Sequence, residues 1–208
     1  LAELKAQNIY WEKILTRGFE KINGKKYLSI LSLKNDIKNF VDVLCKKGVE
    51  TIIHGDYCFS NILFDSSNYV FKLIDPRGRL NSEATIYGDP RYDIAKLRHS
   101  IVGLYDFIVQ DLFKLEESQD GFVYKIFTTS NYNTLTEIFD KYTKINGFEP
   151  KEIKFIEGLL FLSMIPLHKD NFNRQKMFYI RALELLNETL RDINRGNVEW
   201  KKRSLEYV

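Results

Sequence analysis

The sequence has 208 residues, enough for one substantial domain or for two small ones around a shared core. Its formal charge of +3 is small against 31 basic and 28 acidic residues, so there is no electrostatic signature of nucleic-acid binding. No apolar run approaches the roughly 18 residues of a membrane helix, and no signal peptide is visible. We therefore expect a cytoplasmic globular protein that binds neither nucleic acid nor membrane.

The residues before position 54 are predicted to be mainly helical. A first helix is expected to end near Gly18, and Asn23-Gly24 marks a turn. A second helix is expected between Ser32, a candidate N-cap, and Gly48, because apolar residues follow the i, i+3, i+4, i+7 pattern there.

Short strands are predicted next, over 50–53, 61–64 and 69–74, with the turn "DSSN" between the last two. After Pro90 the pattern is helical over 91–104, roughly 105–117, 134–145, 151–165 and 174–194. Pro150 suits a helix start and Pro166 a helix end. The predicted fold class is therefore α+β and mainly α, a helical body with a small β-hairpin element near its beginning.

A polar loop interrupts the strand-rich segment, in "TIIHGDYCFSNILFD" at residues 51–65. Gly55-Asp56 is a turn-forming pair, and the apolar runs on either side of it suit a plain hairpin. That reading accounts for the backbone, but it does not account for the side chains of His54, Asp56 and Asn61.

The spacing of three polar residues matches a catalytic pattern. Asn61 follows Asp56 by five residues, and Asp75, in "FKLIDPRG", lies fourteen residues further on. The protein-kinase signature places a catalytic Asp, an Asn and a metal-binding Asp in this way. Phosphoryl transfer needs a carboxylate to accept the hydroxyl proton, and an amide and a second carboxylate to hold Mg²⁺ against the phosphates.

The set of five identities (His54, Gly55, Asp56, Asn61 and Asp75) is far more specific than any one of them. If each identity has a chance of about one in twenty, a random match is on the order of one in three million per start position.

The segments "HGDYCFSN" and "LIDP" resemble the aminoglycoside phosphotransferase and choline kinase superfamily of small-molecule kinases, which have a protein-kinase-like fold. The resemblance implies Asp56 as catalytic base, Asn61 and Asp75 as ligands of Mg²⁺ and thereby of ATP, and His54 as an orienting residue behind the loop. Gly55 stands where protein kinases carry an arginine that binds a phosphorylated activation loop, so regulation of that kind is not expected.

A second segment, "YGDPRYDIAKL" at 87–97, also resembles this superfamily. It implies a substrate or metal contact for Asp89 or Asp93. The alternative, which we favour, is that Asp93 binds backbone N–H groups and braces the catalytic loop. Arg77 and Arg79 follow Asp75 closely and either meet phosphate or an anionic substrate, or are ordinary surface arginines.

The segment "PLHKDNFNRQ", 166–175, joins two apolar helices with polar residues. By resemblance, helices of this region line the acceptor pocket, which makes His168, Asp170 and Asn171 candidates for substrate binding. The alternative is an ordinary capped connection between helices. His99, on a helix among apolar neighbours, is expected to be structural.

The sequence departs from a complete kinase because neither a glycine-rich phosphate lid nor the paired lysine and glutamate can be placed in it. The resemblance covers about 33–195, so residues 1–208 are expected to be a C-terminal catalytic and acceptor-binding lobe. The N-terminal nucleotide-binding lobe is absent from the sequence, which opens at Leu1 rather than Met. We expect that lobe to be the partner of this one and the 208 residues to be inactive alone.

Two classes of function follow. The first is an ATP-dependent phosphotransferase acting on a hydroxyl of a sugar, choline-like or related metabolite. Similarity of "IHGDYCFSNILFD" and "GDPRYDIAKL" to kinase domains of capsule pathways favours a role in cell-surface polysaccharide biosynthesis. The second is a non-catalytic, kinase-derived module for binding or assembly, which would have no need of a base beside two metal ligands.

Overall fold

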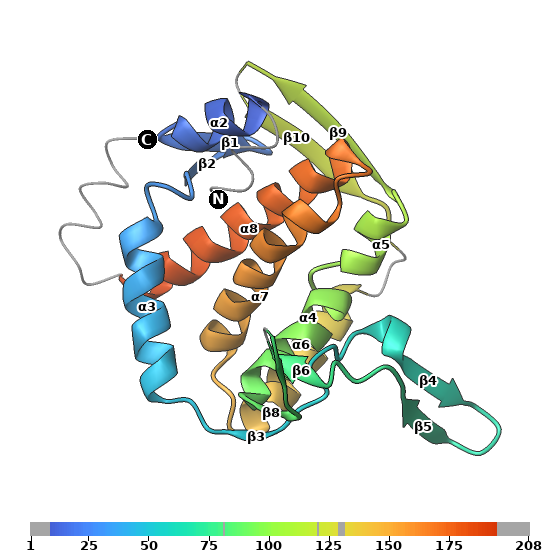
Figure 1. Cartoon of the computed structure of the whole chain (residues 1–208). Coiled ribbons are helices and arrows are strands. Elements are labelled where there is room, and N and C mark those ends of the chain that lie inside the picture. Colours follow the sequence, from blue (N-terminus) through green and yellow to red (C-terminus); the bar gives the residue numbers. More distant parts are fainter. Residues whose placement is uncertain (1–8, 81, 120, 129–131, 195–208) are drawn as a thin grey trace.

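Two helices, α7 (Pro150–Met164) and α8 (Phe172–Ile193), lie side by side at the centre of the fold (Figure 1). The structure is a computed structural model that describes residues 9–80, 82–119, 121–128 and 132–194. Around the central pair lie α3 (Lys34–Lys46), α4 (Pro90–Ile101), α5 (Tyr105–Val109) and α6 (Tyr132–Ile145). The structure confirms the predicted fold class, α+β and mainly helical.

The central helix α8 is buried along most of its length because apolar side chains surround its middle. Its buried apolar residues are Met177, Phe178, Tyr179, Ile180, Ala182, Leu183, Leu185, Leu186 and Leu190. Gly158 of α7 allows the close approach, since a Cβ atom there would lie 2.9 Å from Leu186 Cγ. The core of the protein therefore lies on this helix rather than on the polar loop.

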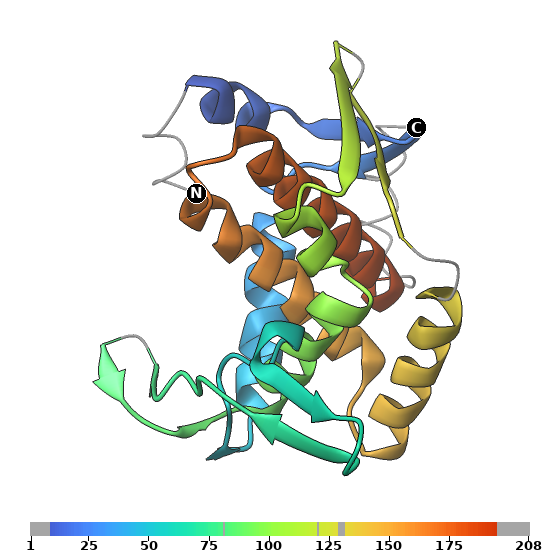
Figure 2. The same ribbon diagram turned by 90° about the vertical axis from the view of Figure 1, so that its right-hand side faces the viewer.

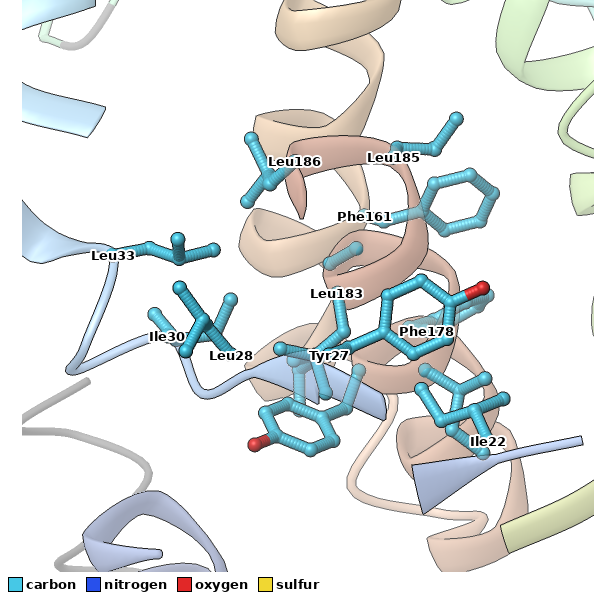
Figure 3. Close-up of a cluster of buried hydrophobic side chains, with 14 of the residues drawn as sticks. Ile22, Tyr27, Leu28, Ile30, Leu33, Phe161, Phe178, Leu183, Leu185 and Leu186 are labelled. Atoms are coloured by element: carbon cyan, nitrogen blue, oxygen red, sulfur yellow. The ribbon is translucent and has the colours of Figure 1, made fainter. Parts of the chain in front are cut away.

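A four-stranded sheet covers one end of α8, with strand order β2-β1-β10-β9. Its strands are β1 (Phe19–Ile22), β2 (Lys25–Leu28), β9 (Phe113–Ser118) and β10 (Gly121–Ile126). All pairs are antiparallel except β1 with β10, which is parallel. Figure 3 shows Ile22, Tyr27 and Leu28 of the sheet beside Phe178 and Leu183 of α8.

This sheet contradicts two sequence predictions. The segment before residue 54 is not mainly helical, because Asn23 (φ 46°) and Gly24 (φ 81°) form a left-handed turn that joins β1 to β2. The helix predicted over 105–117 ends at Val109, and the alternating "FKLEES" continues as strand β9. Each segment forms a local hairpin, β1 with β2 and β9 with β10, and the parallel pairing of Ile22 with Phe122 joins the two hairpins into one sheet.

The other helices confirm the sequence predictions with small shifts. The first helix, α2 (Ile9–Thr16), ends before Gly18, and Pro150 occupies the first turn of α7. Pro166 lies in the short 3₁₀ helix η2 (Ile165–Leu167) that follows α7. Ser32 is not the N-cap of α3, because the cap position is Leu33 and the Ser32 hydroxyl donates to Gly18 O at 3.0 Å.

The predicted strands of the polar-loop region are confirmed. Strand β3 (Thr51–Ile52) pairs with β8 (Tyr87–Gly88), and η1 (Phe59–Asn61) leads into the hairpin of β4 (Ile62–Asp65) and β5 (Val70–Leu73). This hairpin projects from the helical body, as does the short pair β6 (Arg79–Leu80) and β7 (Glu83–Ala84) (Figures 1 and 2). The polar loop thus lies where the helical core meets an exposed hairpin.

None of the helices in the described part of the chain has both the length and the apolar composition that a bilayer crossing requires.

Asn187 fastens β2 to the core, and its removal tests the unpredicted sheet. Its Oδ1 accepts from Leu28 N at 2.8 Å and its Nδ2 donates to Leu28 O at 2.9 Å, in a buried setting. We expect Asn187→Ala to lower the free energy of unfolding by about 2–4 kcal/mol, because two buried backbone groups lose their partner. Urea denaturation measures this. Asn146→Ala, at an exposed helix end, is the control and should cost less than about 1 kcal/mol; equal effects would contradict the prediction.

Candidate functional site

The polar loop, 53–61, starts where β3 ends and turns sharply at Gly55. Gly55 has a φ of 76°, and a Cβ atom there would lie 2.8 Å from the Cβ of Arg77. Glycine meets both the positive φ and the close approach, so this position is under strong steric constraint. Asp56 comes directly after this turn, and its side chain is partly exposed.

The carboxylate of Asp56 is held from two sides. Oδ1 lies 2.8 Å from Nζ of Lys96, and Oδ2 accepts from Nδ2 of Asn61 at 3.2 Å. The same Asn61 amide nitrogen donates to the backbone oxygen of Asp56 at 2.8 Å. The Asp56 side chain remains 37% exposed, so a ligand in solution can reach a carboxylate whose orientation is already fixed.

Asp75 lies beside Asn61 because the backbone of β5 returns to the loop. Ile74 N donates to Asn61 O at 3.0 Å, which places the start of β4 next to the end of β5. Asp75 itself has a φ of 52°, a left-handed conformation that aspartate adopts more readily than most non-glycine residues and that Asp111 shares (φ 56°). Its exposed carboxylate has no hydrogen-bond or ion-pair partner among the described residues.

Asn61 and Asp75 fit the requirements of a hydrated Mg²⁺. The Asn61 amide nitrogen is engaged by Asp56, which leaves its amide oxygen for a cation, and Asp75 adds a negative oxygen ligand. Mg²⁺ commonly uses one or two protein ligands and keeps several waters. The described residues contain no group of three or more His, Cys, Asp or Glu side chains that could hold a metal, so these two residues would bind the ion together with substrate oxygens.

His54 connects the loop to the end of β5. Its Nε2 is 2.9 Å from Ile74 O, and its Nδ1 is 3.3 Å from Asp56 N. Because the carbonyl can only accept and the amide can only donate, this pairing corresponds to a neutral ring with its proton on Nε2. The ring therefore lies behind the loop and fixes Asp56 relative to the strand that carries Asp75.

Helix α4 binds the loop through three side chains on one face. The Asp93 carboxylate accepts from His54 N at 2.6 Å and from Gly55 N at 2.8 Å. Lys96 pairs with Asp56, and Ser100 Oγ accepts from Phe59 N at 3.2 Å. Positions i, i+3 and i+7 share a helix face, which explains how one helix holds the whole loop.

The expectation that Asp93 braces the loop is confirmed, whereas the cap of α4 is Asp89, whose side chain accepts from Arg91 N at 2.9 Å. Lys96 and Ser100 were not predicted. The available signal was their helical spacing from Asp93 in "YDIAKLRHS", since a lysine on the same face as a loop-binding carboxylate must meet the same loop.

A buried ion-pair cluster holds the start of α4 in place. The Arg91 guanidinium donates to Glu152 of α7 at 2.9 Å and to Leu44 O of α3 at 2.7 Å, and Lys47 lies 3.0 Å from Glu152. Burial acts to raise the pKa of Glu152, but the hydrogen bonds from Arg91 and Lys47 outweigh it and lower that pKa. The face of α4 that binds the loop is thus fixed to two neighbouring helices.

Arg77 lies against the loop and Arg79 lies further out. Arg77 N donates to His54 O at 2.8 Å, and its Nη1 donates to the Tyr92 hydroxyl at 2.9 Å. The other guanidinium donors of Arg77 have no protein acceptor among the described residues. Arg79 is exposed in β6. Both arginines line a small cavity with His54 and Gly55, and Arg77 is the one that also hydrogen-bonds to the loop.

The candidates in 166–175 form a capped helix connection, as the second interpretation expected. Asn171 caps α8 by accepting from Arg174 N at 3.1 Å, and its Nδ2 donates to Asp111 at 2.9 Å. Asp170 pairs with Arg174 at 3.1 Å, and His168 packs on Phe178 with ring centroids 4.8 Å apart. Each of the three side chains therefore has a structural contact.

Tyr105 lies between this connection and the polar loop. Its ring is 6.3 Å from that of His168, and it stacks at 4.4 Å on His99, which is fully buried. Burial, with smaller effects of the Asp106, Cys58 and Asp56 charges, raises the pKa of Tyr105 to about 12. The connection is thus near the loop without direct contact, and the expectation that His99 is structural agrees with its ring stacking.

An open, mostly apolar pocket of about 500 Å³ adjoins the loop. It lies between β3, the hairpin and the start of α4, and its lining includes Ile53, His54, Tyr57, Leu73 and Ile94. Its size is in the range of small-molecule sites.

Comparisons with protein-family models, curated proteins and solved structures find no match for this chain. What the fold and the loop define is a helix-rich α+β protein in which Asn61 contacts the Asp56 carboxylate and the exposed Asp75 follows the strand that returns to Asn61.

Loss of the Asp93 carboxylate is expected to loosen the loop. In Asp93→Ala the amides of His54 and Gly55 lose their acceptor, so their hydrogen exchange should accelerate by at least about tenfold, with about 1–3 kcal/mol lost in stability. Exchange mass spectrometry of peptides that cover 51–61 measures the effect. Glu137→Ala, on the exposed surface of α6, serves as the control. Unchanged exchange in the loop of Asp93→Ala would contradict the bracing role.

Proposed function

We propose that this chain is the kinase-like C-terminal lobe of an ATP-dependent phosphotransferase that acts on a hydroxyl group of a small metabolite. The observation that supports the proposal most is the fixed Asp56 carboxylate, which Asn61 orients while the strand after Asn61 brings back Asp75. A structural hairpin would not need a partly exposed carboxylate that Asn61 and Lys96 hold in a fixed direction.

Asp56 is the catalytic base in this proposal. Its carboxylate receives the proton of the acceptor hydroxyl as the oxygen attacks phosphorus, and its fixed direction aims the nucleophile. His54 is the orienting residue, because it holds Asp56 N and the end of β5 at the same time. The brace from Asp93 keeps the loop backbone in the same place through the reaction.

Asn61 and Asp75 would hold Mg²⁺ through the amide oxygen and the free carboxylate. When bound, the ion would supply positive charge that neutralises the phosphates of the nucleotide. Asn61 lies just before β4 and Asp75 just after β5, so both flank the base of this hairpin. In-line transfer depends on how the metal ligands and the base are placed relative to one another.

The acceptor is proposed to be a sugar, choline-like or related metabolite, in the biosynthesis of cell-surface polysaccharide. The apolar pocket beside the loop offers a wall for a small organic molecule, and Arg77 offers donors for an anionic group. His168, Asp170 and Asn171 remain candidates for the outer part of the acceptor site, reached across Tyr105.

A second candidate function is a non-catalytic binding or assembly module, favoured by the lack of a glycine-rich phosphate lid in the 208 residues. A phosphoryl-transfer assay separates the two. The complete gene product is incubated with labelled ATP, Mg²⁺ and a panel of sugars and amino alcohols, and we expect a labelled acceptor. If no member of the panel is labelled, the non-catalytic binding module is the better interpretation.

Asp56→Asn should lower kcat by roughly 10²–10⁴-fold, because the amide cannot accept the proton while its shape preserves the loop. Circular dichroism should show an unchanged fold. Asp65→Asn is the matched control, since Asp65 lies at the far end of β4, where an amide oxygen can still accept from Ser67 N. Full turnover by folded Asp56→Asn would remove the assignment of the base.

Asp75→Ala should abolish activity at all practical Mg²⁺ concentrations, whereas Asn61→Ala should leave a remnant that rises with Mg²⁺. The carboxylate brings charge to the ion and the amide brings only a dipole. Initial rates measured against Mg²⁺ concentration test this order. A normal Mg²⁺ dependence in Asp75→Ala would mean that the metal lies elsewhere.

The 208 residues alone should fold but bind ATP–Mg²⁺ weakly, because phosphoryl transfer is mostly positioning and the lid and lysine that hold the triphosphate are not in the sequence. Isothermal titration of ATP–Mg²⁺ into the chain measures this, and a nucleotide-binding lobe supplied in the complete gene product should restore binding. Tight binding by the chain alone would argue for a complete site of another design.

A further inference from the structure

The ion pair between Lys96 and Asp56 differs from the other contacts between α4 and the loop. Asp93 and Ser100 accept from backbone N–H groups, so they fix the path of the chain. Lys96 contacts only a side chain, with Nζ 2.8 Å from Oδ1 of Asp56. It can leave that carboxylate without disturbing the loop backbone.

Lys96 is 5% exposed, and Asp56 is its one acceptor among the described residues. An ammonium group has three donor hydrogens, so two of them lack a protein acceptor. Burying a cation with incomplete hydrogen bonding is costly, and such groups are kept mainly where function needs them. The free donors lie beside a carboxylate that is open to solvent, which is where a ligand would arrive.

The ionisable groups near Lys96 on α4 and α7 do not provide it with another hydrogen-bond or ion-pair partner among the described residues. Glu157, the buried acid of α7, is hydrogen-bonded to Arg98. Among the described residues neither ring nitrogen of His99 has a hydrogen-bond partner; burial lowers the pKa of His99, helped by the charge of Lys96, so the ring stays neutral. Of the cations on α4, Lys96 is therefore the one directed at the Asp56 carboxylate, whereas Arg98 serves the core.

We propose that Lys96 is a further catalytic residue, which binds the oxygens of the transferring phosphoryl group. This role rests on the proposed phosphotransferase function. In the step, the acceptor oxygen forms a bond to the γ-phosphorus, the bond from that phosphorus to the bridging oxygen of the nucleoside diphosphate breaks, and the hydroxyl proton passes to Asp56. The leaving diphosphate takes the electron pair of the broken bond.

The position of Lys96 explains how it can contact both the Asp56 carboxylate and the phosphoryl oxygens. Negative charge spreads over the equatorial phosphoryl oxygens in the transition state, and a fixed cation within reach stabilises it. Before substrate binds, Lys96 holds Asp56 toward the site. When phosphoryl oxygens arrive, the two remaining N–H groups can bind them, and the carboxylate becomes a better acceptor for the proton as its pairing with Lys96 weakens.

The test compares Lys96→Met, Lys96→Ala and Lys96→Arg in the complete gene product, with labelled ATP, Mg²⁺ and an acceptor that the wild type phosphorylates. We expect Lys96→Met to lower kcat by at least about 100-fold while the acceptor KM changes by less than about threefold. Added ethylammonium should restore part of the kcat of Lys96→Ala, because a small cation can occupy the vacated position. Lys96→Arg should retain more activity than Lys96→Met.

Lys176→Met is the matched control, because Lys176 is also a largely buried lysine in an ion pair, with Glu117 of β9, away from the loop. Its kcat should equal that of the wild type. Thermal unfolding checks for a merely structural role: Lys96→Met should shift the melting temperature by less than about 3 °C, since an incompletely bonded buried charge contributes little to stability.

The outcomes separate this role from the proposed function. Normal kcat in Lys96→Met, with an active wild type, overturns the role of Lys96 alone. A large fall in melting temperature with no rescue by ethylammonium assigns Lys96 to the fold and also overturns it. A wild type that phosphorylates no acceptor overturns the proposed function, and the role of Lys96 with it.

Discussion

The loop depends on one interaction, the acceptance of two consecutive backbone N–H groups by the Asp93 carboxylate. A turn at positive φ leaves the amides of His54 and Gly55 pointing inward, where no strand can pair with them. Unpaired buried amides are costly, so a carboxylate is the efficient partner. Because Asp93 belongs to α4, and Arg91 ties α4 to α3 and α7, the loop takes its position from the helical core.

The exposed hairpin depends on the loop in turn. His54 and Asn61 each contact the end of β5, through Ile74 O and Ile74 N. The strands themselves are exposed on both faces, so their burial contributes little to holding Asp75 in place. The position of Asp75 relative to Asp56 is therefore set by short polar contacts at the base of the hairpin. A hairpin held only at its base can change its tilt more easily than its register.

The sequence predicts local features of this protein better than distant ones. The helices α3, α4, α6, α7 and α8 follow from apolar periodicity, and the turn at Gly55 follows from residue type. The joining of the hairpins β1–β2 and β9–β10 into one sheet on α8 does not, because β1 pairs with β10 across about a hundred residues, and no local pattern carries that information. The spacing from Asp56 to Asn61 and Asp75 is visible in the sequence. The helical spacing of Lys96 from Asp93 is visible too, but its partner Asp56 is defined only by the way α4 packs on the loop.

The contacts that fix the loop backbone are separate from the side chains proposed for chemistry. The site can therefore be rigid and still accessible. Contacts to the backbone, from Asp93 and Ser100, hold the loop without using any of its functional groups. The Asp56 carboxylate can then stay partly exposed and the Asp75 carboxylate unpaired, although each would relax to other partners in a looser loop. The helical core thus fixes the loop backbone, and the side chains proposed for chemistry keep their free lone pairs and hydrogens.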